Sequence, residues 1–166
     1  MYVILSLCNY SIFAEGEFFI IHFLSSSAIF LGGNMINVWI PYQAGFIKYK
    51  DECQKLYESV QDKICDTNTF EFICKNTFFY LFESNECLIG AIYYFIDEDG
   101  KLFLNGFANR KMHKECLECL KMSLNWFKGS IYAEAQNRAS ALCLLRAGFK
   151  RIIHKLFCYN FNNNVN

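Results

Sequence analysis

The residues best placed to do chemistry lie in a polar elbow, Gln136-Asn137-Arg138, between a short apolar strand and a helix. The strand is predicted over 131–135, and Gly148-Phe149 is expected to end the helix, with the glycine in a left-handed conformation. Open α/β sheets bind ligands at the carboxyl ends of their strands, which is where this elbow falls. The amide of Asn137 can cap free N–H groups at the helix start and can also reach a ligand. Two interpretations therefore stay open for Asn137 and Ser140: contact with a ligand, or N-capping alone.

The rest of the chain supplies the elements that such a strand–helix unit needs. Alternation of apolar and polar residues predicts strands, and recurrence at three and four residues predicts amphipathic helices. Asp66-Thr67-Asn68 is expected to cap a short second helix. The predicted strands span 36–42, 77–83, 87–96, 101–108, 131–135 and most of 150–161, and the predicted helices span 43–64, about 69–75 and 109–127, with one more after the elbow. This order predicts an α/β fold with a mixed central sheet, in which an antiparallel meander is followed by a βαβ crossover.

Composition indicates one folded domain. The chain has 166 residues, 54% of them hydrophobic, and a single proline, which excludes a disordered or low-complexity protein. The formal net charge is zero, so no excess of basic residues favours a nucleic-acid partner. Nine irregularly spaced cysteines without an export signal are expected to be reduced thiols in a cytoplasmic protein. Cys116-x-x-Cys119 has no second pair at zinc-like spacing, so no metal site is predicted.

The first 34 residues are interpreted separately from a domain predicted over 35–161, which is followed by a frayed tail at 162–166. They carry only Glu15 and Glu17 as charges, and their longest apolar window is too short for a stable membrane helix. Leu31-Gly32-Gly33-Asn34 can be encoded with an AGGAGG core just before the codon for Met35, as in a bacterial ribosome-binding site. We therefore expect 1–34 to be translated leader sequence. An interfacial or marginal membrane helix, and a genuine extra strand or helix, are the alternatives.

The elbow and its helix also resemble a family motif. The residues Asn137, Ala139, Ser140, Leu142 and Gly148-Phe149 are similar to the N-x-A-S-x-x-L…GF signature of the GNAT superfamily of N-acetyltransferases, and the resemblance suggests a bacterial or phage-encoded member. The element order over Met35 to Phe161 resembles that family as well. The resemblance implies an acyl-CoA N-acyltransferase fold and direct transfer of an acetyl group from acetyl-CoA to an amine on a small molecule or a peptide.

The resemblance also implies where acetyl-CoA would bind. Family members place a glycine-containing turn at the start of the crossover helix, where backbone N–H groups and the helix dipole hold the pyrophosphate. The matching residues here, Arg110 to Lys114 (Arg110, Lys111, Met112, His113 and Lys114), contain no glycine but three of them are basic. They are interpreted either as a phosphate site or as a solvated basic face. His113 also falls on the apolar stripe of the predicted helix, which favours a core position. With Asn137 and Ser140, these residues form the predicted cofactor-binding set.

Catalysis is less well specified. A backbone N–H near Phe107 is expected to polarise the acetyl carbonyl in a gap between the strands at 101–108 and 131–135. The acceptor amine must lose a proton, and Glu134 is the best-placed carboxylate, although an exposed charge at the strand end is the favoured interpretation of this residue. The family's usual acidic tyrosine position is occupied by Leu144. The alternative function is therefore a non-catalytic GNAT-fold protein for binding or assembly. The sequence does not choose an oligomeric state.

Overall fold

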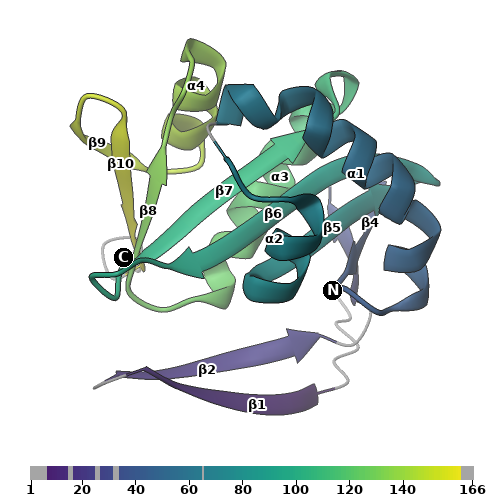
Figure 1. Ribbon diagram of the computed structural model, residues 1–166, viewed down its shortest axis with the longest axis horizontal. Helices are drawn as coiled ribbons and strands as arrows, with labels where there is room; N and C mark the ends of the chain where they lie inside the picture. The colour runs from purple at the N-terminus through teal and green to yellow at the C-terminus, as the bar shows by residue number, and fades with distance from the viewer. Residues whose placement is uncertain (1–6, 15–16, 25–26, 32–33, 65, 162–166) are drawn as a thin grey trace.

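The computed structural model describes residues 7–14, 17–24, 27–31, 34–64 and 66–161, with side chains from Met35 onward. An eight-stranded sheet forms its centre (Figure 1). Neighbouring strands pair antiparallel except β7 and β8, which are parallel. In spatial order the strands are β3 (Ser27–Leu31), β4 (Asn34–Trp39), β5 (Phe78–Ser84), β6 (Cys87–Ile96), β7 (Leu102–Ala108), β8 (Ser130–Glu134), β10 (Leu156–Asn160) and β9 (Lys150–Ile153). The predicted mixed sheet, with a meander and then a crossover, is confirmed.

Helices cover both faces of this sheet. On one face lie α1 (Ala44–Ile64) and α2 (Phe70–Asn76), and behind the sheet lies α3 (His113–Ser123), as Figure 1 shows. Helix α4 (Arg138–Arg146) follows the elbow and packs into the same core as α3, because Leu144 and Leu120 belong to one buried cluster. The chain thus forms three layers with a separate apolar core on each side of the sheet.

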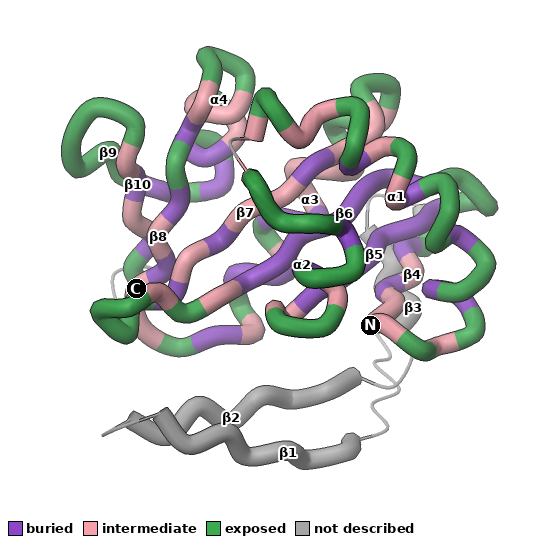
Figure 2. Tube along the Cα trace, viewed as in Figure 1, coloured by how far each residue is buried: buried purple, intermediate pink, exposed green. Residues whose placement is uncertain are grey.

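The two cores follow from sequence periodicity. On α1, Tyr49, Cys53 and Tyr57 recur every four residues and are buried. Along β8, Ile131 and Ala133 are buried while their neighbours are not, so this strand presents alternate residues to the α3 side. The central strands β5 and β6 are buried on both faces, and the buried residues concentrate there in Figure 2.

The region predicted as a single strand after Phe149 is instead a hairpin. Strands β9 and β10 pair antiparallel, and the chain turns at His154 and Lys155. His154 has a φ of 41°, a left-handed conformation that glycine or asparagine would ordinarily mark in a sequence. The hairpin places β10 beside β8, so that β8 has an antiparallel partner on the side away from β7.

The crossover predicted as one helix over 109–127 is divided into three parts. A 3-10 turn, η1 (Arg110–Met112), precedes α3, and a second turn, η2 (Leu124–Trp126), follows it. The short helix α2 is capped by Thr69, whose hydroxyl accepts from the N–H of Phe72 at 3.2 Å. The predicted cap at Asp66 is therefore wrong, and the Asp66 carboxylate is free for the contacts described below.

The first 34 residues contain further strands. β1 (Leu7–Ala14) and β2 (Glu17–Leu24) pair with each other, and β3 pairs with β4 at the edge of the main sheet. This pairing does not reveal where translation begins, so the leader hypothesis stays a prediction, which mass spectrometry of the N-terminal peptide would test. The predicted frayed tail, 162–166, lies outside the described residues. Across the described part of the chain, no helix combines the length and apolar character needed to cross a membrane.

Candidate functional site

The candidate site begins where the two parallel strands separate. β7 and β8 are paired from Leu102 with Ile131 to Leu104 with Ala133, and the pairing then ends although β7 continues for four more residues. The two strands diverge as a V in Figure 1. Backbone groups on the inner edge of β7 beyond Leu104 therefore lack a strand partner and face the gap. The gap expected between these two strands is therefore present.

Backbone N–H groups along β7 point alternately toward β6 and toward the gap, and the hydrogen bonds with β6 show which ones face the gap. The N–H of Asn109 donates to the carbonyl of Ile89 on β6 at 2.8 Å, so the N–H of Phe107, two residues earlier, also points toward β6. Gly106 then points its N–H into the gap. The expected donor near Phe107 thus falls on Gly106, whereas the Phe107 ring is buried under α1.

The Gly106 N–H already has an acceptor. It donates to the side-chain Oδ1 of Asn105 at 2.8 Å, so a carboxamide oxygen sits where a ligand carbonyl oxygen would accept. Asn105 is half-buried and lies on the α1–α2 face of the sheet, like its neighbour Phe107. A ligand oxygen must therefore displace this side chain or use another donor.

Glu134 lies on the opposite arm of the V. Phe103 and Tyr132 share the α1–α2 face and their rings are 5.6 Å apart. The next residues on that face are Asn105 on β7 and Glu134 on β8, one step beyond the last paired residues. Glu134 is exposed and its carboxylate is 3.4 Å from Nε2 of Gln136. It is thus a solvent-accessible carboxylate at the mouth of the gap.

A second carboxylate reaches the same face from the connection between α1 and α2. The Tyr93 hydroxyl donates to Oδ2 of Asp66 at 2.5 Å, and Tyr93 is the ladder partner of Asn105. Burial, with the Asp66 hydrogen bond, holds the pKa of Tyr93 far above its usual range, so this phenol stays protonated. Burial likewise raises the pKa of Tyr57 to about 12, with the charge of Asp66 as the next cause. Neutral tyrosines therefore surround one carboxylate.

The start of α3 lies at the end of β7. Asn109 caps η1 through its Oδ1, which accepts from the N–H of Lys111 at 3.1 Å. Helix α3 continues directly from η1, and Met112 before it makes no side-chain cap in the described structure. Arg110, Lys111 and Lys114 are exposed there and form no ion pair with any described residue.

Two other residues of the predicted cofactor set lie at this helix start. His113 is exposed, so the interpretation of it as a core histidine is wrong. Met112 is half-buried and packs against the core. Neither has a contact that assigns it to a ligand.

The start of α4 is satisfied internally. The Asn137 Oδ1 accepts from the N–H of Ser140 at 2.9 Å, and the Ser140 Oγ accepts from the N–H of Asn137 at 3.1 Å. This reciprocal capping box uses both predicted residues. Within the described chain, the Nδ2 group of Asn137 has no partner, so a ligand can be contacted only through that donor. The helix ends as predicted, with Gly148 at a φ of 100°.

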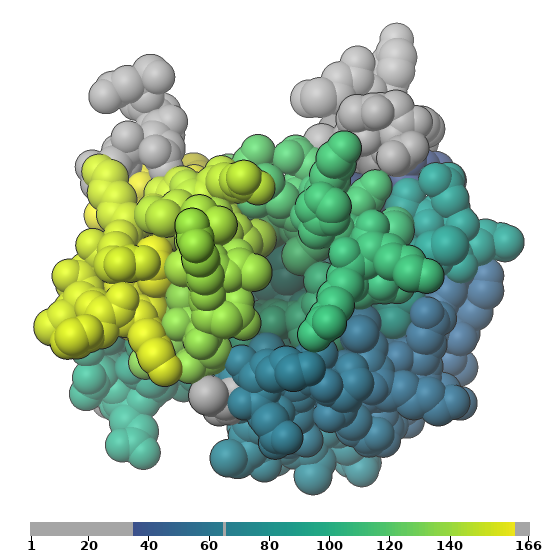
Figure 3. Space-filling model, turned by 90° about the horizontal axis from the view of Figure 1, so that it is seen from above, coloured from purple at the N-terminus to yellow at the C-terminus, as the bar shows by residue number. Residues whose placement is uncertain are grey.

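The elements around the gap enclose a hollow on the surface. Figure 3 looks onto it from above, between the start of α3 in green and the elbow before α4 in yellow-green, with the end of α1 in blue on a third side. The start of α3, the elbow and the end of α1 thus border one concave region. Open α/β sheets bind ligands in this position.

The fold that frames this site is the GNAT acetyltransferase fold. One solved structure, an acetyltransferase of the GNAT family from Staphylococcus aureus Mu50, superimposes with a TM-score of 0.51 at 16% sequence identity, covering 75% of this chain and 98% of that one. A GNAT family acetyltransferase from Listeria monocytogenes 4b F2365 gives a TM-score of 0.44 at 13% identity, over 80% and 97% of the two chains. No family model and no curated protein matches the sequence. At these identities the similarity shows the fold alone.

Sequence reasoning missed two residues of the site. Asn105 lies inside a strand, where only its apolar neighbours contributed to the prediction. Asp66 was interpreted as a helix cap, and its contact with Tyr93 spans 27 residues of sequence. The signal available for Asn105 was its position before a glycine within an apolar strand, since such a glycine often marks close backbone approach.

Proposed function

We propose that the chain is an N-acetyltransferase that uses acetyl-CoA as acyl donor and an amine on a small molecule or a peptide as acceptor. The observation that supports it best is the end of β7–β8 pairing after Leu104 and Ala133, directly beside the helix start that carries the exposed residues Arg110, Lys111 and Lys114. When bound, acetyl-CoA supplies a thioester whose carbonyl carbon the amine attacks: a C–N bond forms, the C–S bond breaks, the thiolate leaves and the amine gives up a proton.

The residues at the start of α3 fit the phosphates of this donor. Arg110, Lys111 and Lys114 supply positive charge, and the positive end of the helix dipole adds to it despite the absence of glycine. His113 and Met112 lie in the same turn and complete the predicted contact surface. On the other side of the gap, the Nδ2 group of Asn137 is available to a carbonyl along the donor's chain.

The proton of the acceptor amine needs a base on the α1–α2 face. Glu134 is accessible there, and Asp66 lies on the same face through Tyr93. Two carboxylates also favour the approach of a cationic amine. Glu134 is the first candidate, because the Asp66 carboxylate already accepts three hydrogen bonds, from Tyr93 and from the backbone and side chain of Asn68.

A thermal-shift titration tests donor binding. Acetyl-CoA at about 100 times its Kd adds about 2.7 kcal/mol to stability, which raises Tm by roughly 5–10 °C in a chain of this size. Arg110→Gln should reduce this shift, and Asn137→Ala should reduce it less, because only one donor of that side chain is free. Lys55→Gln is the matched control, since it removes the same charge from an exposed position on α1.

The competing proposal is a non-catalytic GNAT-fold protein for binding or assembly. The hydrogen bond from Gly106 to Asn105 favours it, because the donor in the gap is occupied, and the position of the usual acidic tyrosine holds the buried Leu144. No thermal shift at millimolar acetyl-CoA would refute the enzyme proposal and favour this alternative. A thermal shift with acetyl-CoA, but no acetylation of any amine in a test panel, would favour a binding role.

A further inference from the structure

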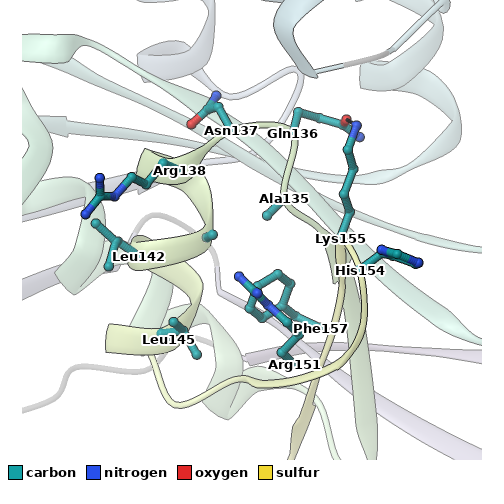
Figure 4. A pocket seen from close by; sticks show the side chains of 11 residues that line it. Ala135, Gln136, Asn137, Arg138, Leu142, Leu145, Arg151, His154, Lys155 and Phe157 are labelled. Atoms are coloured by element: carbon teal, nitrogen blue, oxygen red, sulfur yellow. Dashed lines mark hydrogen bonds between the residues drawn. The ribbon is translucent and has the colours of Figure 1, made fainter.

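A second concave site adjoins the elbow before α4. A cavity of about 420 Å³ opens between α4 and the β9–β10 hairpin. Figure 4 shows it bounded by the helix, the elbow and the hairpin. Its volume falls within the range of small-molecule sites. Acetyl transfer in the gap between β7 and β8 makes no use of it.

The floor and one wall of this cavity are apolar. Phe157 is fully buried and Ala135 is 6% exposed, and both lie at the bottom. Leu142 and Leu145 of α4 line the side and are 43% and 46% exposed, which is high for leucines. Contact with an apolar group would remove this surface from water, at about 25 cal/mol per Å².

Charge in the cavity is of one sign. Arg138, Arg151 and Lys155 line it, and no Asp or Glu does among the described residues. None of the three forms an ion pair within the part of the chain that the structure describes. In a chain of zero net charge, three neighbouring cations without a carboxylate are an uncompensated local excess.

Arg151 is held in a definite position at the floor. Its guanidinium carbon lies 5.2 Å from the centre of the Phe157 ring, and Figure 4 shows the side chain extending across that ring. A planar guanidinium held this way presents paired N–H donors to a carboxylate. Lys155 points to the elbow instead, where its Nζ is 3.3 Å from Oε1 of Gln136.

We propose that this cavity binds a small organic carboxylate, with the carboxylate on Arg151 and a short apolar chain against the exposed side chains of Leu142 and Leu145. One guanidinium on the floor matches a single negative charge, and the leucines match the chain. Asn137 lines both this cavity and the proposed acetyl-CoA site, but Arg151 lies outside the acetyl-CoA site, and occupancy of the cavity does not depend on acetyl transfer.

Isothermal titration with hexanoate tests this site. Hexanoate is expected to bind, whereas hexanol lacks the charge and acetate lacks the chain, so both should bind at least about tenfold more weakly. Arg151→Gln should raise the Kd of hexanoate by about tenfold or more. Lys150→Gln, one residue away, exposed and outside the cavity, removes the same charge and should leave hexanoate unchanged. Both positions are exposed, and circular dichroism would confirm that the variants fold.

Three outcomes would overturn the proposal. Equal binding of hexanol and hexanoate would show that charge is not recognised, and equal losses in the two variants would show that Arg151 is not the anchor. Tighter binding of hexyl phosphate than of hexanoate would assign the site to phosphate esters. Displacement of hexanoate by coenzyme A would place the cavity within the donor site. Failure of acetyl-CoA to bind would leave the hexanoate result unaffected, so the two proposals fail separately.

Discussion

Asn105→Ala tests how the gap between β7 and β8 receives a thioester. In the structure, the Gly106 N–H donates to the Asn105 side chain at 2.8 Å. Acetyl-CoA can use that N–H only after the Asn105 oxygen has left it. Truncation removes the competitor, so the acetyl oxygen then displaces only water.

The magnitude follows from the bond that is lost. A neutral hydrogen bond contributes about 0.5–1.5 kcal/mol net, which corresponds to about a two- to twelve-fold change in Kd. Asn105→Ala should therefore lower the Kd of acetyl-CoA by this factor. Coenzyme A has no acetyl oxygen, so its affinity should not change.

Acetyl-CoA and coenzyme A are each titrated calorimetrically into the unmodified protein and into the Asn105→Ala variant. For each protein, this gives the Kd of acetyl-CoA divided by the Kd of coenzyme A. Asn125→Ala is a matched control, because that exposed side chain hydrogen-bonds only within its own turn, to the carbonyl of Lys121. An unchanged ratio in the Asn105 variant would refute the assignment of Gly106 as the donor. A change of equal size for both ligands would also refute it, since it would reflect altered access and not the acetyl group.

Three further outcomes are expected. Asn137→Ala removes the side-chain cap of α4 and should lower the free energy of unfolding by about 1 kcal/mol in urea. Ser123→Ala leaves the fully buried Tyr94 hydroxyl without its 2.7 Å partner and should cost about 1–3 kcal/mol; adding Tyr94→Phe should recover part of that loss, and additive losses would contradict the pairing. A hydrogen bond with the Cys116 thiol lowers the pKa of Cys143 to about 7. Its labelling by iodoacetamide should therefore rise as pH increases through 7, ahead of the other thiols, and Cys143→Ser should abolish this early phase.

The fold could be predicted because its signals are local. Short turns between apolar strands specify the meander, and a helix between two strands specifies the parallel pair. The hairpin after Phe149 was missed because its turn contains neither glycine nor asparagine: His154 takes the left-handed conformation itself. With no turn residue in the sequence, 150–161 reads as one continuous strand.

The crossover helix shows what periodicity predicts and what it does not. Cys116 and Leu117 pack against the core, and Leu120, Leu124 and Phe127 are buried, so the predicted apolar stripe is present. His113 is the first residue of α3 and is exposed, because burial of the stripe does not extend to that end of the helix. The period of the sequence identifies the buried face but not how far along the helix the burial extends.

The two helix starts beside the gap differ in what they can bind. At α4 the capping box bonds the N–H groups of Asn137 and Ser140, and Arg138 is the one basic residue of the first turn. Helix α3 begins without a side-chain cap in the described chain, and its first turns carry Arg110, Lys111 and Lys114. The anionic end of a ligand should therefore lie at α3. The elbow acts mainly by ending β8, which stops the pairing with β7 after Ala133 and leaves the gap open. The motif formed by the elbow and α4 thus has a mainly structural role. The residues that would bind the phosphates of acetyl-CoA lie in η1 and at the start of α3, where the sequence motif is weaker.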